Sequence, residues 1–143
     1  MKFLKLYLRL GIGIGLLSAV ADRFGLWPKN LSAWGNWENF LVSTKNLNPW
    51  FPENFISTVA FLATAAEIIF GLCLLLGYKT NLFGKLSGVL LLIFALAMAF
   101  SSGIKTPLDY SVFAASGAAF ALGTIKKKFL EIDQLFAKSR KKR

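Results

Sequence analysis

The chain has 143 residues, enough for one domain, and 55% of them are hydrophobic. Its net charge is +10, but the basic residues flank apolar blocks and form no aromatic-rich basic face, which argues against nucleic-acid binding. The chain has one cysteine, Cys73, and no histidine. It therefore lacks a thiol pair and the usual metal ligands, and we expect no metal site and no catalytic site in this chain alone.

Four apolar blocks follow one another along the chain, and most charges lie between them. A helix needs about 20 residues to cross the hydrocarbon core of a bilayer. We predict membrane helices at about residues 4–26, 55–77, 82–103 and 108–125. The sequence thus predicts an all-α integral membrane four-helix bundle that forms one domain over residues 1–143.

The first block contains the shortest uncharged run of the four, which extends only over residues 10–21. It spans the membrane only if Arg9 extends toward one interface. The alternative is a signal peptide cleaved after residues 19–21, Ala-Val-Ala. Gly11 and Gly15 favour a retained helix, since a G-x-x-x-G face allows close helix packing.

The segment at residues 27–51 is too long for a turn and too polar to span, and it contains all four tryptophans. Leu31, Trp34 and Leu41 recur near helical spacing. We predict a short amphipathic helix in the external membrane interface, where tryptophan is enriched. A lid over an external pocket is the alternative.

Glu67 lies near the centre of the block at 55–77 and is the main candidate functional residue. A charged carboxyl at that depth costs roughly 2.5–3.5 kcal/mol and should face the bundle interior. Its role is either a structural link between helices, or a proton relay or ligand for a polar head group such as a quinone carbonyl. Arg9 and Arg23 are its candidate cationic partners, and both lie roughly 10 Å away in depth.

Four further polar residues fall at the predicted outer ends of helices. Asp22 and Arg23 end the first helix, while Asp109 and Tyr110 begin the last. They form a candidate polar rim around an outward-facing pocket. The alternative is that Asp109 caps its own helix and Arg23 is an interfacial charge.

The tail at residues 126–143 is basic and amphipathic, with Phe129, Ile132 and Phe136 on one helical face. Such a helix is expected to lie on the anionic inner leaflet. Docking to a cytosolic partner is the alternative.

The distribution of basic residues predicts the orientation. With the N-terminus inside, 13 of the 17 Lys and Arg residues are cytoplasmic and 4 are external. This excess satisfies the positive-inside rule and places both termini in the cytoplasm. The four external residues are Arg23, Lys29, Lys45 and Lys105.

Several short motifs between residues 10 and 122 together resemble the DoxX-like family of small bacterial membrane proteins. They are Ala21-Asp22-Arg23-Phe24-Gly25, Trp37-Glu38-Asn39-Phe40, Thr64-Ala65-Ala66-Glu67-Ile68 with Gly71 and Leu76-Gly77, Phe94-Ala95-Leu96-Ala97-Met98, and Gly103-Ile104-Lys105 followed by Pro107-Leu108-Asp109-Tyr110-Ser111-Val112-Phe113.

The resemblance implies a four-helix protein of the bacterial inner membrane. Its family is linked to quinol oxidase and thiosulfate:quinone oxidoreductase systems, so it suggests a noncatalytic or quinone-contacting subunit with membrane redox proteins as partners. The alternative functions are a small carrier or lipid-binding protein, which could form a homo-oligomer, and an assembly partner. Apart from membrane lipids and a candidate quinone, the sequence suggests no cofactor.

Overall fold

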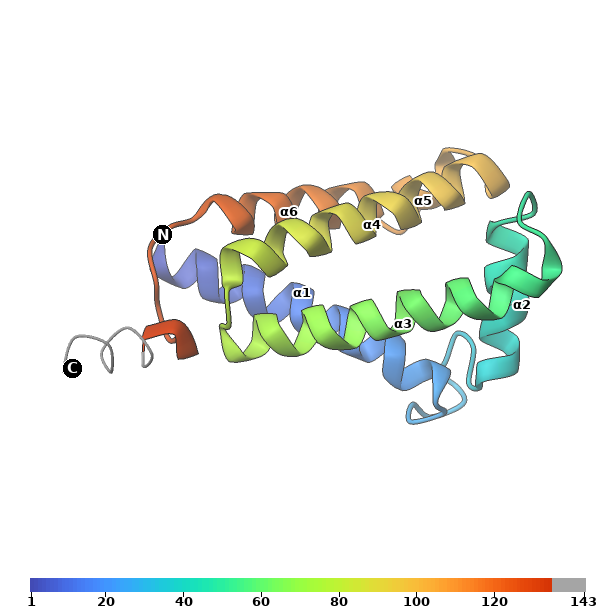
Figure 1. Ribbon diagram of the computed structural model, residues 1–143, viewed down its shortest axis with the longest axis horizontal. Coiled ribbons are helices and arrows are strands. Elements are labelled where there is room, and N and C mark those ends of the chain that lie inside the picture. Colours follow the sequence, from blue (N-terminus) through green and yellow to red (C-terminus); the bar gives the residue numbers. More distant parts are fainter. Residues whose placement is uncertain (135–143) are drawn as a thin grey trace.

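The structure is a computed structural model that describes residues 1–134, in which the regular elements are all helices and there is no strand (Figure 1). Three helices are long and apolar enough to cross a membrane: α1 (Lys2–Arg23), α3 (Glu53–Leu76) and α4 (Thr80–Ser102). Each begins and ends within three residues of its predicted bounds. The prediction of an all-α structure is confirmed for the described residues, and the three long apolar helices are compatible with a membrane helical bundle.

The turn between α3 and α4 is short because two residues adopt left-handed backbone conformations. Gly77 ends α3 with φ of 71°, the conformation that glycine adopts at helix C-termini without a steric penalty. Lys79 precedes α4 with φ of 41°. The hairpin therefore brings the end of α3 and the start of α4 together at the end of the bundle where the chain begins (Figure 1).

Small residues set the contact between α1 and α3, although not the pair that the sequence suggested. A side chain at Gly13 would lie 3.1 Å from the Gly71 carbonyl oxygen, and one at Gly71 would lie 2.8 Å from Leu17 Cγ. Gly11 and Gly15, predicted to form the packing face, have no neighbouring atoms within 4 Å of an added Cβ. The helix presents Gly13 to α3 because the 3.6-residue period puts it on the opposite face from Gly11 and Gly15.

The fourth predicted helix, at 108–125, is divided in the structure. The chain forms α5 (Lys105–Asp109) and α6 (Val112–Thr124), and Ser111 between them adopts a left-handed conformation with φ of 55°. That conformation interrupts the ladder of backbone hydrogen bonds. With 13 residues, α6 is about 20 Å long, less than the ~30 Å hydrocarbon core.

Glycines also allow α6 to pack closely on α4. A side chain at Gly84 would lie 2.9 Å from the Gly123 backbone nitrogen, and one at Gly88 would lie 2.8 Å from Phe120. The Ser116 hydroxyl donates a hydrogen bond of 2.7 Å to the Gly88 carbonyl. The small residues of these two helices therefore act in packing.

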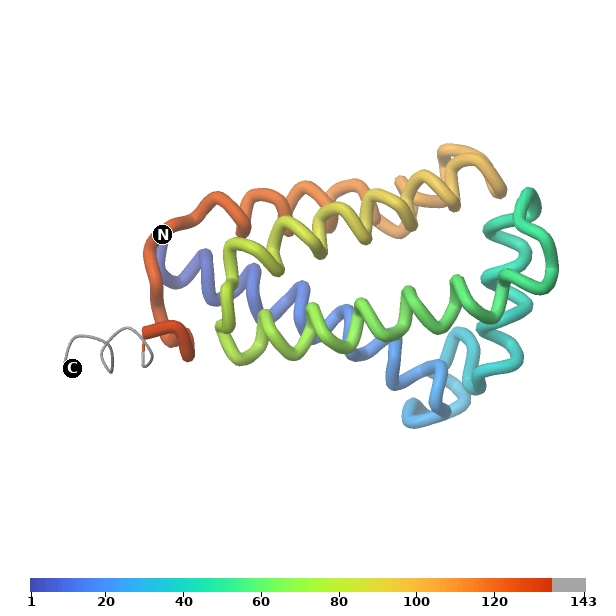
Figure 2. The backbone as a smooth tube through the Cα atoms, viewed as in Figure 1, coloured from blue at the N-terminus to red at the C-terminus, as the bar shows by residue number. Residues whose placement is uncertain are grey.

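The segment predicted as interfacial contains one helix, α2 (Trp37–Leu47), at the end of the bundle opposite the N-terminus (Figure 1). Its first turn is capped by the Asn36 side chain, which accepts a hydrogen bond from the Asn39 amide. Leu31 and Trp34, expected on the same helical face as Leu41, lie in the preceding loop instead. The backbone in Figure 2 turns back on itself between α1 and α2 to form this loop.

The predicted tail helix does not begin at Lys126. Residues 125–131 are non-helical and cross the end of the bundle, and helical geometry returns only at 132–134 (Figure 2). Glu131 is buried with 4% of its surface exposed, so this part of the tail packs against protein. Phe136 and the rest of the predicted tail lie outside the described residues.

Candidate functional site

An ion pair between Arg23 and Glu67 lies inside the bundle between α1 and α3. Arg23 Nη1 donates hydrogen bonds to Glu67 Oε2 and, over 2.6 Å, to Thr64 Oγ1. The exposed fractions of Arg23 and Glu67 are 3% and 2%. Burial of two charges carries a large desolvation cost, which only such close pairing offsets.

Helix geometry explains how Arg23 reaches Glu67 despite their separation in depth. α1 and α3 run antiparallel, with Gly13 beside Gly71 and Arg9 hydrogen-bonded to the Leu75 carbonyl. Side chains tilt toward the N-terminus of their own helix. In antiparallel helices, Arg23 and Glu67 therefore tilt toward each other. The rough 10 Å estimate omitted this tilt and the length of the arginine side chain.

Aromatic rings from α2 and its preceding loop cover the Arg23 guanidinium. Its Cζ atom lies 3.9 Å from the centre of the Phe40 ring and 5.3 Å from that of Trp34. Contacts of this kind stabilise a desolvated cation. Arg23 Nε is buried and has no hydrogen-bond partner among the described residues. Sequence reasoning missed Phe40 and Trp34 as partners of Arg23, since no short-range pattern links them to it.

Asp22 has a different task, which is to fix the loop that carries Trp34. Its carboxylate accepts hydrogen bonds from the Ser32 hydroxyl and from the backbone N–H groups of Ala33, Trp34 and Gly35, the last three at 2.8, 3.1 and 3.4 Å. The carboxylate thus accepts hydrogen bonds from three backbone N–H groups that would otherwise be paired within a helix or strand, and this holds the loop in place. Asp22 thereby positions Trp34 over Arg23, the residue that follows Asp22 in the sequence.

The other two residues of the predicted rim do not join this site. Asp109 is paired with Lys105 on α5, and their side chains are 57% and 83% exposed. Tyr110 is 74% exposed. The structure does not bring Asp22 and Arg23 together with Asp109 and Tyr110 in one rim, because Asp22 and Arg23 turn toward the loop and α3.

An open groove of about 840 Å³ runs along α3 beside the ion pair. Thr64 belongs to both features, since it lines the groove and also accepts the hydrogen bond from Arg23. The other lining residues are mostly apolar or aromatic: Phe24, Trp37, Ser57, Thr58, Phe61, Ala65, Ile68 and Ile69. The groove is open and mostly apolar, and its volume lies within the range of small-molecule sites.

Chemically, the site offers charge, hydroxyl groups and aromatic surface. The described part of the chain contains no group of three or more His, Cys, Asp or Glu residues that could hold a metal ion. Cys73 on α3 is a free thiol and does not line the groove. The arrangement can bind and orient a ligand.

Comparisons of the chain with protein-family models, with curated proteins and with solved structures found no match.

Proposed function

We propose that this chain is a DoxX-like membrane protein that binds a membrane-resident amphiphile, such as a quinone, in the groove along α3. The observation that supports it is the shared position of Thr64, which lies at the groove wall and contacts the buried Arg23–Glu67 pair. A ligand in the groove would lie next to a fixed, paired charge in a protein of low polarity.

The residues that line the groove indicate how an amphiphilic ligand would be oriented in it. Ser57 and Thr58 lie near the start of α3, and their side chains are exposed. Ile68 and Ile69 lie further along the helix, about 15 Å or more from the two hydroxyls at 1.5 Å per residue. An amphiphile would place its polar head at Ser57 and Thr58 and its apolar tail toward the middle of the membrane.

Ligand binding can be followed through Trp37, because its ring lines the groove. We expect a short-chain quinone such as decylubiquinone to quench tryptophan emission saturably in detergent micelles. Ala65→Phe should weaken this binding by roughly tenfold or more, a loss of about 1.4 kcal/mol or more, since the larger ring fills the groove.

Ala114→Phe on the exposed face of α6 is the matched control and should leave the affinity unchanged. Equal quinone affinity in Ala65→Phe and wild type would reject the groove as the site. Absence of saturable quenching by both the quinone and a fluorescence-quenching lipid would reject the proposed function. A pull-down in mild detergent then distinguishes a redox subunit, which retains oxidoreductase partners, from a carrier that purifies alone or as a homo-oligomer.

The proposed membrane arrangement adds a fourth crossing to the three long helices. α5 and α6 together would supply it, with the break at Ser111 near the external interface. Both termini would lie in the cytoplasm of a bacterial cell and α2 at the external interface. The charge distribution and the packing of α6 along α4 support this arrangement.

Reporter fusions test this topology. We expect fusions after Lys79 and after Arg143 to report a cytoplasmic location, and a fusion after Lys45 to report an external one, because the basic residues are concentrated on the first side. An external reading after Arg143 together with a cytoplasmic reading after Lys79 would mean that α5 and α6 do not complete a crossing.

A further inference from the structure

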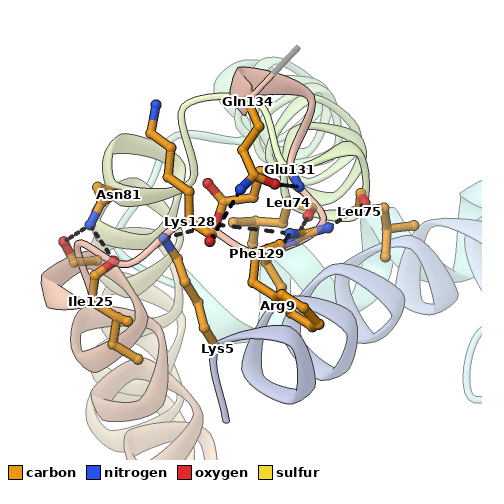
Figure 3. Close-up of polar contacts among 11 residues, drawn as sticks. Lys5, Arg9, Leu74, Leu75, Asn81, Ile125, Lys128, Phe129, Glu131 and Gln134 are labelled. Atoms are coloured by element: carbon orange, nitrogen blue, oxygen red, sulfur yellow. Dashed lines mark hydrogen bonds and ion pairs between the residues drawn. The ribbon is translucent and has the colours of Figure 1, made fainter. Parts of the chain in front are cut away.

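The second buried charge cluster lies at the opposite end of the bundle, where the C-terminal strap, residues 125–134, crosses α1 and α3 (Figure 3). Lys5 Nζ lies 2.8 Å from Glu131 Oε1, and Arg9 Nη1 lies 3.9 Å from the same oxygen. Lys5 is fully buried, with an exposed fraction of 0%. Apart from these ion pairs, Lys5 Nζ and Glu131 Oε1 have no hydrogen-bond partner among the described residues. Each charge therefore depends on the other for compensation.

Arg9 ties the strap to the end of α3. Its guanidinium donates hydrogen bonds to the carbonyl oxygens of Leu74 and Leu75 at 2.8 and 3.1 Å, and to that of Phe129 in the strap at 3.0 Å. A cation at the C-terminus of α3 also interacts favourably with the helix dipole. One side chain thus connects the first helix, the third helix and the strap.

The strap packs directly against the backbone of Gly77. A Cβ atom at Gly77 would approach the Glu131 Cα to 2.7 Å, a distance that real side chains do not reach. The start of the strap is held by Asn81, whose amide donates to the carbonyls of Ile125 and of Gly123 at the end of α6, at 3.0 and 2.9 Å. These contacts fix the strap at both ends, and its course across the bundle end follows from them.

The strap separates its charges between two sides. Glu131 points into the bundle, whereas Lys126, Lys127 and Lys128 are exposed, and in Figure 3 the Lys128 side chain points away from Glu131. Three more exposed lysines, Lys2, Lys79 and Lys85, lie near the same end, in the first turn of α1, the α3–α4 turn and the start of α4. Glu131 is neutralised inside the bundle while the lysines stay exposed, so this end of the bundle carries six exposed lysines.

We propose that the C-terminal strap is an anionic-lipid contact, in which Glu131 locks the strap to Lys5 and Arg9 so that Lys126, Lys127 and Lys128 meet negatively charged headgroups. Lysines near an anionic membrane surface each contribute favourably, and fixing three of them in one place avoids the cost of ordering a free tail. This contact does not depend on the groove along α3.

Trypsin tests the proposal, because a protease must take up an extended stretch of backbone, so cleavage after Lys126, Lys127 and Lys128 should be faster when the strap leaves the bundle end. The full-length protein is placed in nanodiscs of phosphatidylcholine alone or of phosphatidylcholine mixed with phosphatidylglycerol, and cleavage at the three lysines is followed by mass spectrometry. A soluble peptide substrate gives the rate of trypsin itself in each lipid. We expect cleavage of the wild type to be roughly tenfold slower with phosphatidylglycerol.

Glu131→Gln should speed cleavage roughly tenfold in phosphatidylcholine, since the buried cations lose their counter-ion. Asp133→Asn, which removes an acid two residues away, is the control and should be cleaved like the wild type. If Glu131→Gln does not fold, Lys5→Gln, which leaves Glu131 with Arg9 alone, should also speed cleavage. Equal wild-type rates in the two lipids would overturn the lipid contact. Wild-type cleavage rates in folded Glu131→Gln, or in Lys5→Gln where Glu131→Gln does not fold, would overturn the lock.

Discussion

Replacement of Arg23 by leucine is expected to destabilise the bundle by about 3–5 kcal/mol, because it leaves Glu67 buried without its cation. Glu67→Leu should cost a similar amount, since Arg23 would then keep only Thr64 and its aromatic neighbours. Glu67→Gln preserves the shape and hydrogen-bonding capacity of the side chain but removes its charge. It should fall between the wild type and Glu67→Leu. Reversible unfolding of the purified protein in mixed micelles of mild detergent and dodecyl sulfate measures these losses.

The double variant Arg23→Leu with Glu67→Leu decides whether the loss comes from the pair. Two apolar side chains of similar volume bury no charge, so the double variant should be more stable than either single variant. If the losses of the single variants simply add in the double variant, the two residues are not energetically coupled and the ion pair has no special weight. Quinone affinity measured on the wild type, the two single leucine variants and the double variant shows whether the ion pair also affects binding in the groove.

Asp22→Ala is expected to cost about 2–4 kcal/mol, since four hydrogen-bond donors lose their charged acceptor. The loop before α2 should open, and Trp34 should move away from Arg23. Asp22→Asn keeps one acceptor oxygen and should lose less. Unfolding in detergent gives the stability, and faster tryptic cleavage after Lys29, which lies in this loop, reports the opening.

Asp109→Ala is the matched control for this prediction. Asp109 is exposed and paired with Lys105 one helical turn away, a type of surface pair that contributes ~0–1 kcal/mol. We therefore expect Asp109→Ala to behave almost like the wild type. A loss in Asp22→Ala no larger than that in Asp109→Ala would contradict the role of Asp22 as the anchor of the loop.

The sequence determined the features that depend on local composition and period. Long, mostly apolar runs predicted α1, α3 and α4, because a backbone in lipid must satisfy its hydrogen bonds within the segment. Gly77 marked the end of α3, since glycine adopts the left-handed conformation readily. The central position of Glu67 in its apolar run singled it out, because a carboxyl at that depth needs a partner.

Tertiary structure alone decided which residues meet. Arg23 was one of two candidate partners of Glu67, and the antiparallel register of α1 and α3 selected it. Arg9, the other candidate, pairs instead with the end of α3 and with Glu131, 122 residues further along the chain. The sequence shows that a charged residue within an apolar run needs a partner. It does not show which residue will be that partner, because contacts between distant segments depend on how the helices pack.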